Sequence, residues 1–465
     1  MNPRSFVNQI ALITAFAAVS LAPSQSLAVP AKPNLLLIVS DDAGYADFGF
    51  QGCKDIATPK LDALAKEGLR FTQGYAPGPV CSPSRAGMMT GKTPARTGHE
   101  NNLRDGFGVD AATSLLPARL KALGYHTGMV GKWHLGAEKP YLPWERGFDD
   151  FYGFLGGEHN YFAPTNKVNI MLRNGEKVAE PEYLTDAFAR EAENFIRTNS
   201  NKSQPWFLYL ALNAVHMPMQ AKPAELEKIS HISNQQRRVL AAMTVSLDQG
   251  VGRALAALDA AGVTSNTLVI FINDNGGATY SKFYNTPLRG FKGTLFEGGI
   301  RVPLLARWPG LLPAGKTFDA PATGLDLLPT LLAAGGARPD AWADSDGVNL
   351  LPYLTGKNPA RPHSDLFWRF NVVAAVRAGD WKLIRIQGAP PLLFNLATDL
   401  PEKNNLAAEN PDKVRDLLAK LADWEKPFPA PRWEEGANWD KIHFKDHTGP
   451  PIYQGPIKSP VIDVE

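Results

Sequence analysis

The chain has 465 residues, of which 48 are Lys or Arg and 46 are Asp or Glu, so its formal net charge is +2. It has no basic run and no repeat of basic and aromatic residues, which argues against a nucleic-acid-binding protein. Cys53 and Cys81 are the only cysteines, so at most one disulfide can form and stability must come from the core.

The first 28 residues have the pattern of a secretory signal peptide. Arg4 supplies the positive charge, residues 10–22 are mostly apolar, and Ser26-Leu27-Ala28 places small residues before the expected cleavage point. The apolar stretch is shorter than the roughly 20 residues that a membrane span needs, and a retained N-terminal anchor is the alternative. No later segment is long and apolar enough to span a bilayer. We therefore expect a periplasmic or secreted protein without stable membrane insertion.

Apolar strands and helices alternate beyond this leader. Apolar runs typical of buried parallel strands occupy residues 34–40, 206–212 and 267–272, and residues 125–130 have an extended pattern. Helical spacing is found at 59–69, where Thr58 is the expected N-cap and Pro59 the first helical residue, and at 115–123, 185–198 and 235–261. The alternation predicts an α/β fold with a mainly parallel central sheet flanked by helices.

The C-terminal quarter of the chain has a different pattern. Residues 335–362 are rich in Pro and Gly and are typical of a connection. Short strand candidates follow at 366–370, 373–377, 381–386 and 392–396, with a helix at 411–421, and these predict a small antiparallel sheet. The tail from residue 427 is expected to wrap the surface. The predicted organisation is a signal peptide (1–28), a catalytic α/β domain (29–355) and a C-terminal subdomain with its tail (356–465).

Polar residues follow three of the predicted strands directly. Ligands of open α/β sheets bind at the carboxyl ends of the strands, so these residues should meet at one edge. Four of them, Asp41, Asp42, Asp274 and Asn275, present only oxygen ligands, and sites of this kind without added His or Cys suit Ca²⁺ or Mg²⁺. Helix caps and an ordinary turn are the alternative for these residues. The residues are Asp41 and Asp42, Asn213 and His216, and Asp274 and Asn275.

The run Cys81-Ser82-Pro83-Ser84-Arg85 is the most informative motif. A lone cysteine is usually a small buried apolar residue. The spacing Cys-x-Pro-x-Arg, however, resembles the signature that sulfatases present to a formylglycine-generating enzyme, which oxidises the cysteine to an aldehyde. Five further segments match the sulfatase pattern in the same order along the chain. They are Asp41-Asp42-x-Gly44-x-x-Asp47, Gly131-Lys132-Trp133-His134-Leu135-Gly136, His216-x-Pro218, Asp274-Asn275-Gly276-Gly277, and Arg289-Gly290-x-Lys292 followed by Glu297-Gly298-Gly299-x-Arg301-Val302-Pro303.

The chain is thus similar to the type I formylglycine-dependent sulfatases, in the branch of arylsulfatase A and N-acetylgalactosamine-6-sulfatase. The resemblance implies an alkaline-phosphatase-like fold and hydrolysis of a sulfate ester, with a sulfated carbohydrate or aryl sulfate as substrate. It also implies one Ca²⁺ per site, held by Asp41, Asp42, Asp274, Asn275 and the modified residue at Cys81. The implied catalytic residues are Cys81 as formylglycine, Arg85, Lys132, His134, His216 and Lys292.

The chemistry of each residue type agrees with these roles. A thiolate that attacked a sulfate ester would form a stable S-sulfonate, whereas an aldehyde hydrate has a second hydroxyl that allows sulfate to leave. Arg85 is a fixed cation that can stabilise charge at residue 81, and Lys132 and Lys292 can contact sulfate oxygens. The resemblance implies that His216 is the general acid and His134 the base.

Other polar residues fit structural roles or stay open. We expect Asp47 to be structural and Glu297 and Arg301 to form an ion pair or a turn. Two polar groups could line the mouth of the pocket or could be solvated loops, and three further histidines receive no chemical role. The first group is His99, Glu100, Asn101, Asn102 and Arg104, the second is Glu158, His159, Asn160 and Tyr161, and the histidines are His363, His443 and His447.

Three other functions compete with the sulfatase interpretation. A phosphate or phosphonate ester hydrolase would use the same fold and nucleophile. A thiol hydrolase pairing Cys81 with a histidine would leave the acidic residues at the strand ends unexplained. A carbohydrate-binding protein without catalysis is disfavoured, because none of the matched positions is lost.

Overall fold

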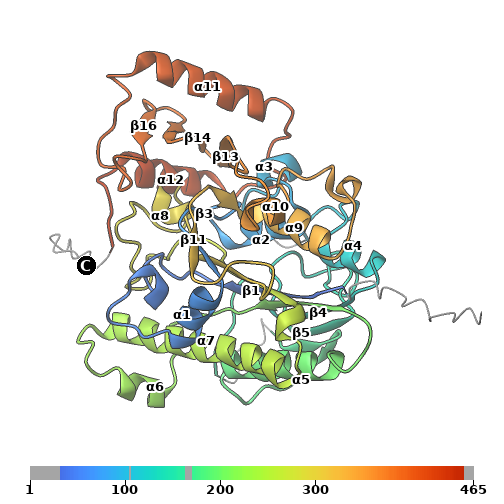
Figure 1. Ribbon diagram of the computed structural model, residues 1–465. Helices are drawn as coiled ribbons and strands as arrows, with labels where there is room; N and C mark the ends of the chain where they lie inside the picture. The colour runs from blue at the N-terminus through green and yellow to red at the C-terminus, as the bar shows by residue number, and fades with distance from the viewer. Residues whose placement is uncertain (1–31, 104–105, 163–169, 455–465) are drawn as a thin grey trace, which may run out of the picture. The chain divides into compact units, whose positions relative to one another are not determined.

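A computed structural model describes residues 32–103, 106–162 and 170–454 (Figure 1). The predicted signal peptide, residues 1–28, lies outside the described residues, as does Arg104. Within the described part, no helix combines the length and the apolar character that crossing a membrane requires.

A ten-stranded sheet lies at the centre of the fold. Strand β1 (Asn34–Ser40) pairs in parallel with β8 (Trp206–Ala211) on one side and β9 (Thr267–Asn273) on the other. Strand β4 (His126–Lys132) pairs in parallel with β8 and with β5 (Asp150–Phe154). The predicted mainly parallel sheet is confirmed. The remaining strands are β2 (Leu69–Phe71), β6 (Leu172–Arg173), β7 (Glu176–Lys177), β10 (Leu304–Arg307) and β11 (Lys316–Phe318), in the order β11-β2-β10-β9-β1-β8-β4-β5-β6-β7.

Helices cover both faces of this sheet (Figure 1). Alternate side chains of a strand point to opposite faces, so Leu35 and Leu37 of β1 enter one core while Leu36 and Ile38 enter the other. Both faces are apolar, which explains why the strand sequences are continuous apolar runs. Helices α2 (Cys81–Thr90), α4 (Leu116–Ala122) and α9 (Leu327–Ala334) pack on the first face, and α1 (Pro59–Glu67), α5 (Leu184–Asn199) and α7 (Gln235–Ala260) on the second.

The start of α1 differs from the prediction in one respect. Thr58 occupies the N-cap position, but its hydroxyl makes no capping bond; it accepts a hydrogen bond from the Gly49 N–H at 2.8 Å instead. The free N–H groups of Lys60 and Leu61 donate to the carboxylate of Asp248 on α7, the latter at 2.8 Å. A tertiary contact therefore replaces the expected local cap, and it joins α1 to α7.

A separate antiparallel sheet follows, as predicted. It contains β13 (Asp365–Phe370), β14 (Val373–Ala378), β15 (Trp381–Ile386) and β16 (Leu392–Asn395). One face packs against α11 (Pro411–Glu425), and the other packs against Leu295, Phe296 and Ile300. The tail also contains a helix, α12 (Ala437–Thr448), that the sequence patterns do not predict. The shorter elements are η1 (Gly49–Gln51), β3 (Gly74–Tyr75), α3 (Pro94–Thr97), α6 (Pro223–Lys228), η2 (Thr264–Asn266), α8 (Glu297–Ile300), β12 (Ala322–Thr323), η3 (Gly324–Asp326), η4 (Pro339–Trp342) and α10 (Leu351–Leu354).

A buried ionic network joins the small sheet to α8. Lys382 of β15 contacts the carboxylates of both Glu297 and Glu402 at 2.9 Å, and all three side chains are fully buried. Arg301 pairs with Glu297 at 3.2 Å, which confirms the expected ion pair. Tyr75 donates a further hydrogen bond to Glu297 at 2.7 Å. Lys382 is thus shared by two buried carboxylates, of which Glu297 also pairs with Arg301.

We expect Lys382→Met to lower the free energy of unfolding by about 3–5 kcal/mol, since it leaves two buried carboxylates without their shared cation. Urea unfolding at pH 8 measures the loss. Lys420→Met is the matched control, because Lys420 pairs with Asp365 at 2.9 Å near the surface and its loss should cost less than about 1 kcal/mol. Equal losses in the two variants would contradict a special role for the buried network.

Candidate active site

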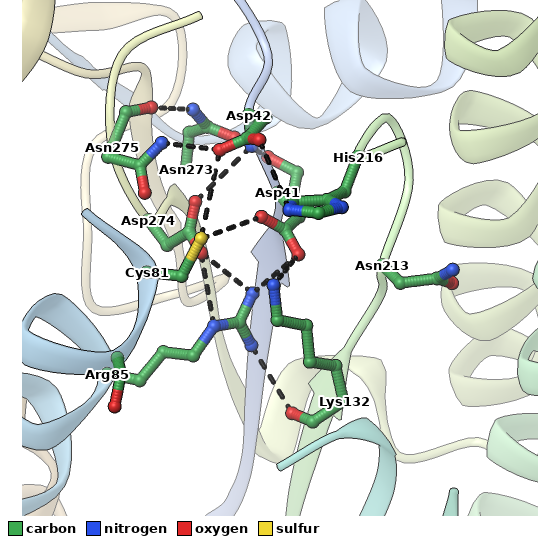
Figure 2. A network of polar contacts seen from close by, with 12 residues as sticks. Asp41, Asp42, Cys81, Arg85, Lys132, Asn213, His216, Asn273, Asp274 and Asn275 are labelled. Carbon is green, nitrogen blue, oxygen red and sulfur yellow. Dashed lines mark hydrogen bonds and ion pairs between the residues drawn. The ribbon is translucent and has the colours of Figure 1, made fainter. Parts of the chain in front are cut away.

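Four neighbouring strands bring the predicted site residues together. Asp41 and Asp42 follow β1, His216 follows β8, and Asp274 follows β9, while Lys132 is the last residue of β4. The order β9-β1-β8-β4 places these strand ends side by side at one edge of the sheet. The side chains converge on a small buried space, which Figure 2 shows.

Cys81 enters this space from the first turn of α2. The helix begins at Cys81 after the extended residue Val80, and all ten helix residues are buried. Pro83 fits the first turn, where its missing N–H breaks no helical hydrogen bond. The Sγ of Cys81 lies 3.5 Å from Asp41 Oδ1 and 3.0 Å from Lys292 Nζ. The thiol therefore lies among charged side chains although it is only 1% exposed.

Two fully buried cations hold the carboxylates in place. The guanidinium of Arg85 donates from Nη2 to Asp274 at 2.8 Å and lies 3.4 Å from Asp41. The ammonium of Lys132 contacts Asp41 Oδ2 at 2.5 Å. Figure 2 shows both cations beneath the carboxylates and the thiol. Charge compensation at this depth allows carboxylates to lie close together without water.

Asp42 receives three donors from the segment between β9 and α8. Lys292 Nζ contacts Asp42 Oδ2 at 2.8 Å, and Asn275 Nδ2 donates to Asp42 Oδ1 at 2.7 Å. The hydroxyl of Tyr280 also donates to Asp42 and accepts a hydrogen bond from the Met217 N–H at 3.1 Å. Tyr280 was not among the sequence candidates. It lies between the motifs Asp274-Asn275-Gly276-Gly277 and Arg289-Gly290-x-Lys292 and belongs to neither, so sequence alone offers no signal for it.

The oxygen atoms at this edge fit a hard cation. Oδ1 of Asn275 is buried and has no hydrogen-bond partner among the described residues. Such an oxygen costs free energy unless a donor or cation satisfies it. Ligand atoms of Asp41, Asp42, Cys81 and His216 lie within 4.8 Å of one another. Asp274 instead pairs with Arg85, and its Oδ1 accepts the N–H of Asp42 at 3.3 Å.

The two candidate histidines follow neighbouring strands, His134 after β4 and His216 after β8. His216 Nε2 is 3.6 Å from Asp42 Oδ2, and its Nδ1 is 2.8 Å from the carbonyl oxygen of Met217. Because a carbonyl only accepts, Nδ1 carries a hydrogen and Nε2 faces the site. His134 has Nδ1 buried without a partner in the described part of the chain. Its ring lies against Gly157, where a Cβ would come within 2.8 Å of Nε2.

The surrounding charges shift the pKa values of the site. Burial opposes ionisation of Asp41, but Lys132 and other cations hold its pKa well below the ordinary value. Burial and Asp41 raise the pKa of Asp274 to about 7. Burial also raises the pKa of the Cys81 thiol, and Asp41 adds to that rise. The thiol is therefore protonated near neutral pH, in which form it is a poor nucleophile.

Burial likewise lowers the pKa of both histidines. For His134 the lysine Lys132 adds to the effect, and the pKa lies well below its ordinary value. For His216, Asp41 and Asp42 act in the opposite sense, and the pKa is still lowered. Asp42 and His134 both have positive φ angles, 59° and 55°, which are unusual for residues other than glycine. Backbone strain of this kind is concentrated at functional sites.

Some predicted polar residues lie away from this cluster. Asp47 is buried and forms an ion pair with Arg237, in agreement with a structural role. The side chain of Asn213 points away from the carboxylates in Figure 2. Both cysteines are free, and Cys53 contacts Asp55 at 3.1 Å.

The segment after α3 is buried rather than solvated. His99 and Asn101 have no exposed surface. They lie beside Trp433 of the C-terminal tail, whose Nε1 donates to the carbonyl oxygen of Asn102 at 2.7 Å. The tail therefore does more than wrap the surface, because it contacts residues next to the Cys81 helix. No local pattern in the sequence connects these two segments.

Comparison of the sequence with known proteins points to a single protein family. A family model described as Sulfatase matches residues 33–337. N-acetylgalactosamine-6-sulfatase of Sus scrofa is 34% identical over 381 residues, which are 76% of this chain and 72% of the relative. Arylsulfatase A of Homo sapiens is 34% identical over 461 residues, which are 86% of this chain and 88% of the relative.

Solved structures share the fold. The crystal structure of Ps i-CgsB in complex with k-i-k-neocarrahexaose is 37% identical, with a TM-score of 0.83, and covers 90% of this chain and 98% of that chain. The phosphonate monoester hydrolase of Agrobacterium radiobacter, at 22% identity and a TM-score of 0.64, covers 85% and 95% and is similar in fold alone. The fold is the alkaline-phosphatase-like one expected from the sequence. Because the family model spans more than half of the chain and the relatives match most of its length, the chain belongs to the sulfatase family of sulfuric ester hydrolases.

Proposed function

We propose that the protein removes sulfate from a sulfated carbohydrate, using a formylglycine hydrate formed from Cys81 and one bound Ca²⁺. The position of Cys81 Sγ carries this proposal. The sulfur lies 3.0 Å from Lys292 Nζ and 3.5 Å from Asp41 Oδ1. These charged groups suit an oxygen nucleophile bound to a metal cation better than they suit a thiol.

Calcium fits the available donors. Asp41, Asp42 and Asp274 offer carboxylate oxygens, and the unpartnered Oδ1 of Asn275 offers a neutral one. Residue 81 would complete the set in its modified form. Bound there, Ca²⁺ would lower the pKa of the nucleophilic hydroxyl and offset the negative charge of the sulfate group.

The modification explains how sulfate can leave. The hydrate would supply one hydroxyl to attack sulfur and a second hydroxyl whose deprotonation releases sulfate. We assign the role of general acid toward the leaving oxygen of the sugar to His216, whose Nε2 faces the site. His134 is the proposed base for the second hydroxyl. Lys132 and Lys292 are the proposed ligands of the sulfate oxygens that gain charge in the transition state.

The charge of the site favours sulfate over phosphate monoesters. Three carboxylates face three cations, so their formal charges cancel, and a divalent cation leaves +2. A deprotonated nucleophile and a sulfate monoester, with one negative charge each, restore neutrality. A phosphate dianion would leave an excess negative charge in a buried site, which is costly. The carboxylates are Asp41, Asp42 and Asp274, and the cations are Arg85, Lys132 and Lys292.

The proposed substrate class is a sulfated oligosaccharide. Ps i-CgsB, 37% identical to this chain, binds k-i-k-neocarrahexaose, and the relative from Sus scrofa is an N-acetylgalactosamine-6-sulfatase. A direct comparison of neocarrahexaose with N-acetylgalactosamine 6-sulfate, by sulfate release, tests both classes. We further propose export to the periplasm or outside the cell, with a formylglycine-generating enzyme acting on Cys81 before folding buries it.

Cys81→Ala should reduce sulfate release by at least about 10⁴-fold, because the nucleophile is lost. Intact mass measures maturation, since the aldehyde is lighter than the cysteine form by about 18 Da. Cys53→Ser is the matched control and should keep both activity and the mass change. Full activity in protein that retains an unmodified Cys81 would refute the formylglycine mechanism.

A comparison of matched aryl esters tests the preference for sulfate. Phosphate release that exceeds sulfate release would refute this preference.

Removal of calcium should abolish activity, and added Ca²⁺ should restore it and raise the melting temperature. Asn275→Ala should raise the Ca²⁺ concentration for half-maximal stabilisation by at least about 10-fold, because it removes an oxygen ligand. Asn213→Ala is the control, since its side chain points away from the cluster. A melting temperature that does not respond to Ca²⁺, or an equal response in both variants, would argue against the assigned ligands.

His216→Asn should slow hydrolysis of a sugar sulfate by about 10²–10⁴-fold, because a sugar alkoxide needs a proton to leave. Hydrolysis of 4-nitrophenyl sulfate should fall much less, since nitrophenolate leaves without one. The ratio of kcat/KM values for the two substrates measures the effect. His231→Ala changes an exposed histidine and serves as the control. Equal losses on both substrates would show that His216 is not the general acid.

A further inference from the structure

His99, Ser82 and His134 form a continuous hydrogen-bonded chain beside the candidate nucleophile. Ser82 Oγ lies 2.7 Å from His99 Nε2 and 2.8 Å from the carbonyl oxygen of His134. All three residues are at least nine-tenths buried. We infer that His99 is a positioning residue, which acts through Ser82 to orient His134, the proposed base.

The direction of the hydrogen bonds follows from the atoms involved. A carbonyl oxygen only accepts, so the single hydroxyl hydrogen of Ser82 is donated to His134. His99 Nε2 must then donate to Ser82 Oγ, which fixes the tautomer of His99. Its Nδ1 is buried and has no partner within the described ranges. Within the described ranges the His99 ring therefore makes one polar contact, the hydrogen bond that it donates to Ser82, and no second polar contact of the ring explains its burial.

The backbone of His134 needs such support. Its φ of 55° lies in the left-handed region, which residues other than glycine rarely adopt. The His134 N–H donates to the Leu155 carbonyl at 3.1 Å, and Ser82 holds the carbonyl on the other side. The ring then lies against Gly157. Release of the carbonyl would allow the residue to relax and would shift its ring from its place against Gly157.

The C-terminal tail holds His99 in turn. The ring of Trp433 meets the imidazole edge-on, with centroids 4.7 Å apart at 76°. Hydrogen bonds join this segment to its neighbours: Asn101 Nδ2 donates to the Trp433 carbonyl at 3.0 Å, and Asn102 accepts from Trp433 Nε1 at 2.7 Å. Asn102 Oδ1 also accepts the N–H of Ser82 at 3.3 Å. The tail therefore reaches the proposed base through two residues.

The consequence for catalysis rests on the proposed function. In its second step His134 takes the proton of the remaining hydroxyl, the C=O bond of the aldehyde re-forms, and the C–O bond to sulfate breaks. Sulfate leaves with the electron pair of that bond. Misplacement of His134 should slow this step alone, because cleavage of the sulfate ester uses His216 instead.

The test separates the two steps with 4-nitrophenyl sulfate. His99→Phe keeps the ring beside Trp433 but has no donor for Ser82. We expect its first turnover of nitrophenol to proceed at the wild-type rate, while steady-state turnover falls about 10- to 100-fold, as for a misplaced catalytic group. Sulfate retained on the acid-quenched protein should rise toward one per formylglycine, with formylglycine content normalised by intact mass. His99→Gln, which restores an N–H donor, should recover part of the steady-state rate.

Three outcomes overturn the inference. Equal slowing of both steps in His99→Phe would show a general structural role, and wild-type kinetics would show none. Failure of His99→Gln to improve on His99→Phe would show that the donor is not what matters. If His99→Phe does not fold, Trp433→Leu takes its place, with the same selective loss expected and the same readouts.

His134→Ala distinguishes failure of this inference from failure of the proposed function. Retained sulfate in His134→Ala supports its role as the base, whatever His99 does. Retained sulfate in His134→Ala but not in His99→Phe overturns only the positioning role. The absence of retained sulfate in His134→Ala removes the assigned second step, and the inference falls with it.

Discussion

Close packing of like charges away from the protein surface is the constraint on which this structure depends. Carboxylates of Asp41 and Asp274 lie in a site with no exposed surface, where each ion would cost several kcal/mol if unpaired. Arg85 makes the arrangement possible because its planar fork reaches both carboxylates from one helix turn beyond Cys81. A residue of the Cys81-Ser82-Pro83-Ser84-Arg85 motif is thus also the charge that holds two neighbouring strand ends together.

The small antiparallel sheet supports another part of the site, the loop that carries Lys292. Lys292 belongs to a loop that continues into Leu295 and Phe296, and these residues are packed beneath the antiparallel sheet. The ionic network of Lys382 fixes the next turn, α8, through Glu297. The C-terminal part of the chain therefore fixes the loop that carries one of the two proposed sulfate-binding lysines, although it contributes no ligand to the proposed calcium site.

The central fold was predictable because β1, β8 and β9 are buried on both faces and have continuous apolar sequences. The site was predictable because polar residues such as Asp41 and Asp274 end neighbouring strands. Contacts between distant segments were not. Thr58 is the N-cap of α1 as predicted, but the side chain that accepts the free N–H groups is that of Asp248, 188 residues beyond Lys60, which no local signal reveals. Helix α12 buries His443 but exposes Trp439 and Ile442, the reverse of the pattern that reveals a helix in sequence.

The contact between Trp433 and the His99 segment can form only late in the synthesis of the chain. Asn101 and Trp433 are 332 residues apart, and a ribosome that adds 5–20 residues per second needs roughly 20–65 s to make that length. Until the tail emerges, the segment behind Ser82 lacks its closing contact. The proposed formylglycine-generating enzyme, which must reach an extended Cys81, would therefore have an interval set by translation speed, and synthesis of the tail would end that interval.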